Sequence, residues 1–237
     1  MQGFAQEFRS AIELILAGDS ALWAIVLLSL QVSLIAVAVA ALIGLPLGAL
    51  LAVGRFPGRR VLIVLMNALM GLPPVVVGLL VYLALSRSGP FGPLQLLYTP
   101  TAMIIAQIVL VTPIIAALSR QTVQMLDEEY ADQLRSMGVS RMGSVPTLLW
   151  DGRLALLTAL LAGFGRAVGE VGAVMIVGGN INHVTRVMTT TIALETSKGN
   201  LAMALALGAI LVGLAVLVTG SVAVLGLRSE AAGLRHA

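Results

Sequence analysis

Apolar segments of about 20 residues or more recur along the whole chain, and each is long enough to cross the hydrocarbon core of a membrane. Charged residues make up only 11% of the 237 residues, against about 25% in an average soluble domain, so too little polar surface remains to enclose a water-soluble core. We therefore predict an all-α, polytopic transmembrane helical protein. About five spans are expected, over residues 22–53, 61–85, 100–119, 154–178 and 201–227.

Basic residues are distributed unevenly over the segments that join these spans, and such an excess marks the cytoplasmic side. The richer side carries Arg55, Arg59, Arg60, Arg120, Arg135, Arg141, Arg153, Arg228 and Arg235, and the other side carries Arg9, Arg87, Arg186 and Lys198. We expect a multi-pass protein of the inner (plasma) membrane with its N-terminus outside and its C-terminus in the cytoplasm. The segment 187–196 could add a sixth span only by re-entering the membrane, because it is too short to cross, so five or six spans are possible.

The predicted organisation has three parts: an external or interfacial segment over 1–20, a membrane domain over 21–227 and a short cytoplasmic tail over 228–237. The first part is expected to form a short helix on the membrane surface, with a frayed terminus as the alternative. This expectation depends on the helical spacing of Phe4, Phe8, Ile12 and Ile15. A solvated external loop with some helical potential is expected over 179–200, with the polar residues Asn180, Asn182, Thr185 and Thr189.

The residues needed for several kinds of chemistry are missing from the sequence. Cysteine is absent, and the two histidines, His183 and His236, are isolated, so we expect no metal site and no thiol nucleophile. Lys198 is the only lysine and does not belong to a G-x-x-x-x-G-K phosphate-binding loop. We therefore predict no catalytic residue and no cofactor on this chain, so any ATP would be used by a partner subunit.

One long polar segment, 120–153, separates the third and fourth spans. The acidic residues 127–129 favour the start of a helix, and Gly138 permits a sharp turn before a second short helix that starts after Ser140. An apolar stripe at helical spacing runs through Leu126, Tyr130, Leu134 and Met137. Two short amphipathic helices around a glycine indicate a partner-docking element. A solvated loop folded on its own protein is the alternative, and the pattern alone does not separate the two.

Two charged residues and two prolines interrupt the apolar spans. Arg166 and Glu170 are four residues apart in the fourth span, so we expect them on one helix face. Ionisable groups at that depth are costly, and they face either a partner charge or an aqueous path. Arg166 could line an anion pathway with Glu170 holding it, or the two could form a purely structural ion pair. Pro73 and Pro74 predict a kink in the second span, which either lines a gate or only packs.

The polar segment resembles the cytoplasmic coupling loop of ABC importer permeases, whose pattern is E-A-A-x-x-x-G followed by nine residues and I-x-L-P. Gly138 matches the glycine, and Asp132 keeps the acid in kind, whereas Leu148, Trp150 and Asp151 depart from the second half of the pattern. The resemblance implies a coupling helix that docks in a groove of an ABC ATPase subunit. The residues it assigns to that contact are Asp132, Leu134, Gly138, Val139 and Arg141.

A second resemblance lies in the spans. The run G-R-A-V-G-E-V-G-A at 165–173, followed by G-N-I, and the run L-P-P-V-V-V-G at 72–78 resemble the molybdate, tungstate and sulfate group of type I ABC importer permeases. The segments 139–150 and 188–195 look most like the tungstate branch. The resemblance implies the ABC transmembrane type-1 core over 21–227 and an oxyanion path lined by Arg166, Glu170, Pro73 and Pro74.

The same resemblance implies a permease homodimer in contact with membrane lipid, two cytoplasmic ATPase subunits and an extracytoplasmic solute-binding protein, with no role for nucleic acid. The expected function is import of an oxyanion, tungstate or molybdate first. A sulfate permease of the same superfamily, or a self-sufficient anion channel or secondary carrier, is the alternative. Which oxyanion is carried stays open, because in such importers the binding protein does much of the selecting.

Overall fold

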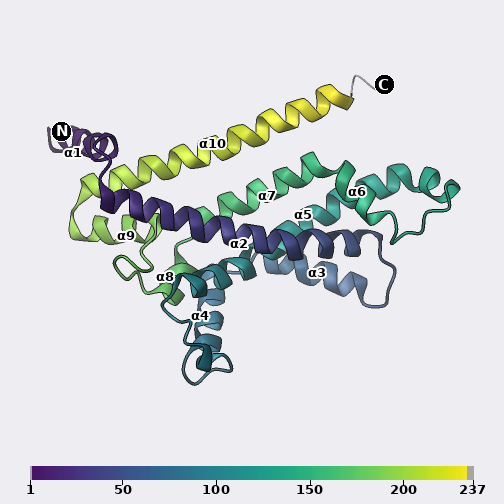
Figure 1. Ribbon diagram of the computed structural model, residues 1–237, viewed down its shortest axis with the longest axis horizontal. Helices are drawn as coiled ribbons and strands as arrows, with labels where there is room; N and C mark the ends of the chain where they lie inside the picture. The colour runs from purple at the N-terminus through teal and green to yellow at the C-terminus, as the bar shows by residue number, and fades with distance from the viewer. Residues whose placement is uncertain (1, 234–237) are drawn as a thin grey trace. The chain divides into compact units, whose positions relative to one another are not determined.

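The computed structural model describes residues 2–233, and within this range all regular structure is helical and no strand occurs (Figure 1). The chain divides into two compact units that are described separately. Unit 1 contains Met1–Ala36, Pro73–Gln107 and Gly165–Leu217, and unit 2 contains Val37–Leu72, Ile108–Phe164 and Val218–Ala237. The long helices α2, α5 and α10 contribute to both units.

Three helices are each long and apolar enough to cross a membrane, and they reproduce three of the predicted spans. These are α2 (Ser20–Val53), α5 (Pro100–Ser136) and α10 (Leu201–Gly233), the last of them apolar over Leu201–Ser221. The count rises to five if each of two broken helix pairs, α3 with α4 and α6 with α7, is taken as one span. The helical, polytopic architecture is therefore confirmed, and five is the upper count for the described residues.

The second predicted span is not one kinked helix. It is broken into α3 (Arg59–Met70) and α4 (Pro74–Leu85). Pro73 has an extended backbone with ψ of 124°, as expected for a residue that precedes proline, and Pro74 occupies the first turn of α4. Because the two prolines also lack backbone N–H groups, the helical hydrogen bonds cannot continue across this point. The predicted bend at the two prolines is therefore present, as a break with an angle of 104° between α3 and α4 and not as a kink within one continuous helix.

In unit 2, the end of α2 packs against α5 and the short helix α6 (Val145–Asp151). Gly48 allows the close approach, because a Cβ atom there would lie 2.7 Å from the Cβ of Ser119. The hydroxyl of Ser119 donates a hydrogen bond to the carbonyl oxygen of Leu45 at 3.0 Å. The core of this packing consists of Ala49, Ala52, Val53, Val123 and Leu148.

Unit 1 contains four further short elements, and one of them, α8, packs closely on α4. A Cβ atom on Gly78 of α4 would lie 2.8 Å from the Cα of Ala173 in α8, so only glycine fits at this contact. The expected N-terminal helix is present as α1, while its position on a membrane surface stays a prediction. The four elements are α1 (Gln2–Leu16), the 3₁₀ turn η1 (Gly92–Leu94), α8 (Gly172–Gly178) and α9 (Met188–Lys198).

Candidate functional site

The fourth apolar run is interrupted where its two charges lie. Helix α7 (Arg153–Val168) ends before Gly169, and α8 begins at Gly172, so Glu170 lies in a short non-helical link. The prediction that Arg166 and Glu170 share one helix was therefore wrong. The link has its own partners, because the carbonyl oxygen of Glu170 accepts a hydrogen bond from the hydroxyl of Thr189 at 2.7 Å.

The two charges nevertheless form an ion pair. Arg166 Nη1 donates to Glu170 Oε2, while Glu170 Oε1 accepts a bond from the backbone N–H of Ala173 at 3.2 Å in the first turn of α8. The side chain of Glu170 is 4% exposed and that of Arg166 is 36% exposed. Both carboxylate oxygens are thus engaged, whereas only one nitrogen of the guanidinium contacts Glu170. This geometry is the pairing that both interpretations expected, and it leaves Arg166 able to meet an anion.

The start of α4 lies against this link. A Cβ atom on Gly172 would come within 2.8 Å of Val75 Cγ2 and 3.6 Å of Glu170 Oε1. Since Pro74 directly precedes Val75, unit 1 brings the double proline next to the ion pair, although the two are about 90 residues apart in the sequence. All four predicted path residues, Pro73, Pro74, Arg166 and Glu170, therefore lie in unit 1.

Uncharged polar residues of the spans surround the same link, and sequence reasoning missed them. Gln107 Nε2 donates to the carbonyl oxygen of Ala167 at 3.1 Å, and its Oε1 is buried without a partner in the structure. Ser29 Oγ accepts a bond from the backbone N–H of Met188 at 2.7 Å. With Ser33, Glu170 and Thr189 they line a cavity of about 10 Å³, which is space for one water at most. The sequence feature that could have identified Gln107, Ser29 and Ser33 is a hydroxyl or amide side chain within an otherwise apolar run.

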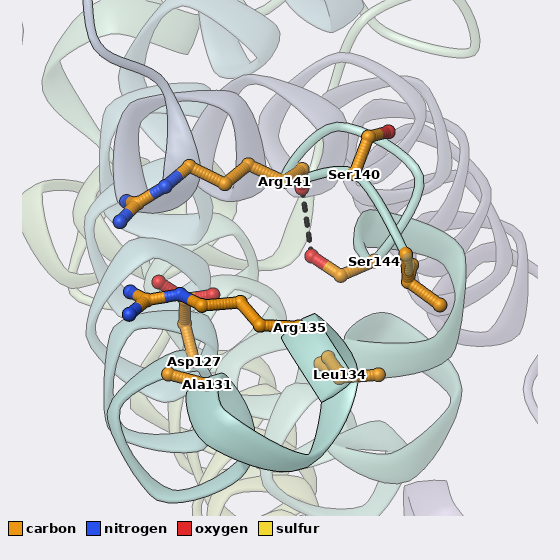
Figure 2. Close-up of a pocket in the computed structure, with 8 residues that line it drawn as sticks. Asp127, Ala131, Leu134, Arg135, Ser140, Arg141 and Ser144 are labelled. Carbon is orange, nitrogen blue, oxygen red and sulfur yellow. Dashed lines mark hydrogen bonds between the residues drawn. The ribbon is translucent and has the colours of Figure 1, made fainter. Parts of the chain in front are cut away.

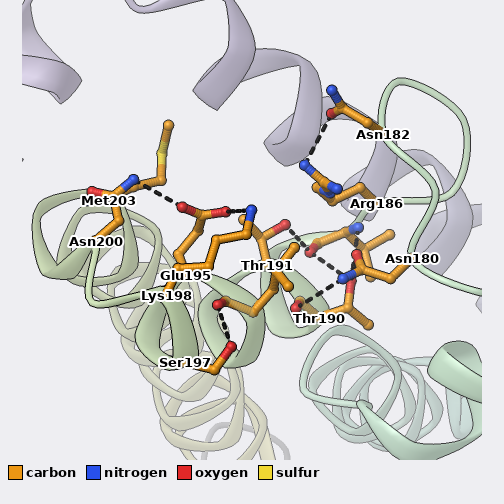
Figure 3. A network of polar contacts seen from close by, with 12 residues as sticks. Asn180, Asn182, Arg186, Thr190, Thr191, Glu195, Ser197, Lys198, Asn200 and Met203 are labelled. Atoms are coloured by element: carbon orange, nitrogen blue, oxygen red, sulfur yellow. Dashed lines mark hydrogen bonds and ion pairs between the residues drawn. The ribbon is translucent and has the colours of Figure 1, made fainter.

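The segment 179–200 is not the solvated loop that its composition suggested. Thr185 and Thr189 are buried, and the hydroxyl of Thr185 accepts a bond from the backbone N–H of Ile181 at 2.9 Å. Asn180 Oδ1 and Thr190 Oγ1 are 2.9 Å apart (Figure 3). The hydroxyls are thus used to satisfy buried backbone groups, a role that polarity alone cannot distinguish from solvation.

At the end of α9, Glu195 is almost buried and has two partners. Lys198 Nζ lies 2.9 Å from Glu195 Oε1, and Asn200 Nδ2 donates to Glu195 Oε2 at 2.8 Å (Figure 3). The hydrogen bond from Lys198, followed by that from Asn200, lowers the pKa of the Glu195 carboxyl below its usual range. This network closes the C-terminal end of α9.

The polar segment 120–153 begins as part of a transmembrane-length helix. Helix α5 continues without interruption from Pro100 to Ser136, so the acidic residues 127–129 lie inside it and not at a helix start. The prediction of a separate first helix was wrong, because acidic residues also occur at exposed positions of helix interiors. The second short helix is present as α6, but it begins at Val145 and not directly after Ser140.

Gly138 ends α5 with a left-handed backbone. Its φ is +74°, and the backbone N–H of Val139 donates to the carbonyl oxygen of Leu134 at 3.0 Å, which closes the last turn. A Cβ atom at this glycine would meet nothing of its own chain within 4 Å. The backbone at Gly138 is therefore open to close approach from outside the chain.

The apolar stripe of this segment serves two purposes. Leu126, Tyr130 and Leu134 pack against the core of unit 2, so they fold the segment onto its own protein. In contrast, Met137 is 76% exposed and Trp150 is 71% exposed, on the two sides of the Gly138 turn. Large apolar side chains in such exposed positions mark a surface that another molecule can cover.

Between α5 and α6 the chain forms a small hollow lined by charged and hydroxyl side chains (Figure 2). Arg135 and Arg141 extend beside each other over Asp127 in this view, and Ser144 Oγ donates to the carbonyl oxygen of Arg141 at 2.7 Å. Asp132, which is fully exposed, lies 3.8 Å from Arg135 and adds little stability in solvent. The predicted coupling residues thus lie within one short stretch, with Leu134 facing its own core.

The side chains that could bind a metal ion are scattered in the part of the chain that the structure describes. Among the described residues no group of three or more histidine, aspartate or glutamate side chains could hold a metal ion. His183 lies away from any such group, and His236 is outside the described residues.

Known proteins resemble this chain over most of its length. The family model of the binding-protein-dependent transport system inner membrane component matches residues 44–230. The tungstate uptake system permease protein TupB of Peptoclostridium acidaminophilum is 41% identical over 211 residues, 89% of this chain and 92% of that protein. A probable anion ABC transporter permease protein of Haloferax volcanii is 42% identical over 78% of this chain and 82% of its own length.

A more distant relative is the sulfate transport system permease protein CysW of Escherichia coli K12, which is 30% identical over 67% of this chain and 57% of that protein. The family match begins within α2, extends through α3 into α10, and therefore includes the ion pair and the Gly138 turn. The chain belongs to the family of binding-protein-dependent transport system inner membrane components, the permease subunits of ABC importers.

Proposed function

We propose that this chain forms the membrane path of an ABC importer for tungstate, with molybdate as the next candidate. The observation that carries the proposal is the difference in likeness to named permeases. Identity is 41% to a tungstate permease over 92% of its length, but 30% to a sulfate permease over 57% of its length. Sulfate therefore ranks after tungstate and molybdate, and the binding-protein-dependent family argues against a self-sufficient channel or carrier.

Membership in this family implies partner subunits, an ATPase and a solute-binding protein. We infer that the ATPase docks on the segment around Gly138, on the cytoplasmic side given by the arginine distribution. Support comes from the open backbone at Gly138 and from the exposed Met137 that directly precedes it. Asp132, Val139 and Arg141 would set the register of the contact by their charge and shape. The permease would work as a homodimer, since one such chain cannot readily enclose a path.

For the path itself, Arg166 is the candidate anion contact. Its guanidinium is bound by Glu170, and its side chain as a whole is 36% exposed. Glu170 would act as a positioning residue, because both of its carboxylate oxygens are already engaged. The helix breaks at 71–73 and 169–171 lie where unwound backbone can change conformation during transport.

The deciding experiment uses the complete importer. The permease is reconstituted with the ATPase and binding protein that its neighbouring genes encode, and ATP-dependent uptake of tungstate, molybdate and sulfate into vesicles is compared. We expect tungstate uptake that disappears without the binding protein or ATP. Uptake of sulfate alone would refute the substrate, and uptake by the permease alone would refute the coupled mechanism.

A further inference from the structure

A cavity of about 160 Å³ lies in unit 1, between the first turns of α2 and the segment that precedes α9. A single water needs only about 10–15 Å³ of such space, so a polyatomic ligand fits. One wall is polar and carries Asn182, His183 and Arg186. The opposite wall is apolar and carries Ile25 and Leu28 of α2, with Ala24 beside them. No acidic side chain lines the cavity.

Arg186 in this wall has more donors than the protein satisfies. Its Nη1 donates to Asn182 Oδ1 at 3.1 Å (Figure 3). Its Nε is buried without an acceptor, and no carboxylate of the described residues lies within ion-pair distance of its guanidinium. A guanidinium carries five N–H donors and a permanent positive charge. A half-buried arginine with one protein partner is therefore short of an anionic acceptor.

Neighbouring carboxylates do not supply that acceptor. Asp19, next to the start of α2, accepts a bond from the backbone N–H of Leu22 at 2.8 Å. Glu195 on α9 is near enough to attract Arg186 electrostatically, but its two carboxylate oxygens are hydrogen-bonded by Lys198 and Asn200 and not by Arg186. In addition, the cavity adjoins the first turns of the 34-residue helix α2, whose N-terminal end favours negative charge.

We propose that this cavity, the Arg186 pocket, binds a tetrahedral oxyanion on the guanidinium of Arg186, with Asn182 and His183 as further polar contacts. Two sources have this chemistry. One is the phosphate of an anionic phospholipid, whose apolar part would cover Ile25 and Leu28. The other is the transported oxyanion, captured before it enters the path, and only this source depends on the function proposed above.

The test uses the full chain purified in a sugar-based detergent without phosphate. One arm measures binding of tungstate by calorimetry, and the other counts phosphatidylglycerol adducts by native mass spectrometry. Arg186→Gln should weaken binding in at least one arm by about tenfold or more, because a charge-assisted contact is lost. The matched control Arg87→Gln removes an exposed arginine of the same unit that lies outside the cavity, and it should bind like the wild type.

A second variant keeps the guanidinium and fills the cavity instead. Ala24→Phe adds a ring from α2 and should also reduce binding, and it guards against misfolding of the Arg186 variant. Loss confined to the tungstate arm identifies the transported oxyanion, and loss confined to the lipid arm identifies a phospholipid. The proposal is overturned if neither probe binds, or if binding in both arms is the same in the wild type, Arg186→Gln and Ala24→Phe.

Discussion

Gly138 offers the sharpest test of how this permease meets its ATPase. Its φ of +74° is a left-handed conformation that costs a residue with a side chain about 1–2 kcal/mol, and more for a β-branched one. Gly138→Val should therefore lower the population of the docking-competent turn by about 5- to 30-fold. A new Cβ would meet nothing of its own chain within 4 Å, so we expect the variant still to insert and fold. Co-purification of the ATPase, with ATP-dependent uptake, measures the loss.

Two control variants separate backbone strain from lost contact with the partner. Gly199 has a φ of +80° and equally open surroundings, so Gly199→Val carries the same strain away from the docking segment and should leave ATPase binding intact. Asparagine tolerates the left-handed conformation. If the partner's backbone must approach closely, Gly138→Asn will still fail to bind the ATPase. Normal assembly and uptake of both Gly138→Val and Gly138→Asn would refute the assignment of this turn as the docking point.

Three further outcomes follow from the structure. Glu170→Gln leaves the partly exposed Arg166 without its carboxylate and should lower the free energy of unfolding in micelles by about 1–3 kcal/mol, whereas the Arg166→Gln/Glu170→Gln double variant should recover part of this. If that double variant is stable and still takes up tungstate, Arg166 is only structural. Because the pKa of Glu195 is lowered, its network stabilises the fold above the usual glutamate pKa and is lost as the pH falls through the folded-state value. Thermal stability in acid should therefore drop less steeply for Glu195→Gln. Gly78→Leu should cost about 1–3 kcal/mol by overpacking α4 on Ala173, while Gly165→Ala, with nothing within 4 Å, should not destabilise the protein in the same melting experiment.

The sequence was most informative where an element is bounded by charge. The charge-free run between Asp19 and Arg55 predicted α2 almost to the residue, because charged groups mark where a span leaves the hydrocarbon core. Hydropathy did not predict the length of α5, since a helix can continue into water as far as its backbone hydrogen bonds and packing allow. Tyr130 and Leu134 provide that packing against unit 2.

The charged residues of the candidate site were predicted from the sequence, but the uncharged polar residues around them were not. The spacing of Arg166 and Glu170 fits an unbroken helix as well as it fits the observed link, so periodicity could not reveal the break at 169–171. Gln107 and Ser29 carry no charge and do not disturb a hydropathy profile. Their roles depend on tertiary contacts with Ala167 and Met188, which no local pattern contains.

The continuity of α5 has a mechanical consequence. A helix of 37 residues is a rod about 55 Å long at 1.5 Å per residue. Pro113 removes one backbone bond but does not interrupt it. In the proposed function, a push delivered beside Gly138 would therefore act on the end of a continuous helix and not on a slack linker. The 37 residues would respond as one stiff lever, in contrast to the links at 71–73 and 169–171, whose backbone is not helical.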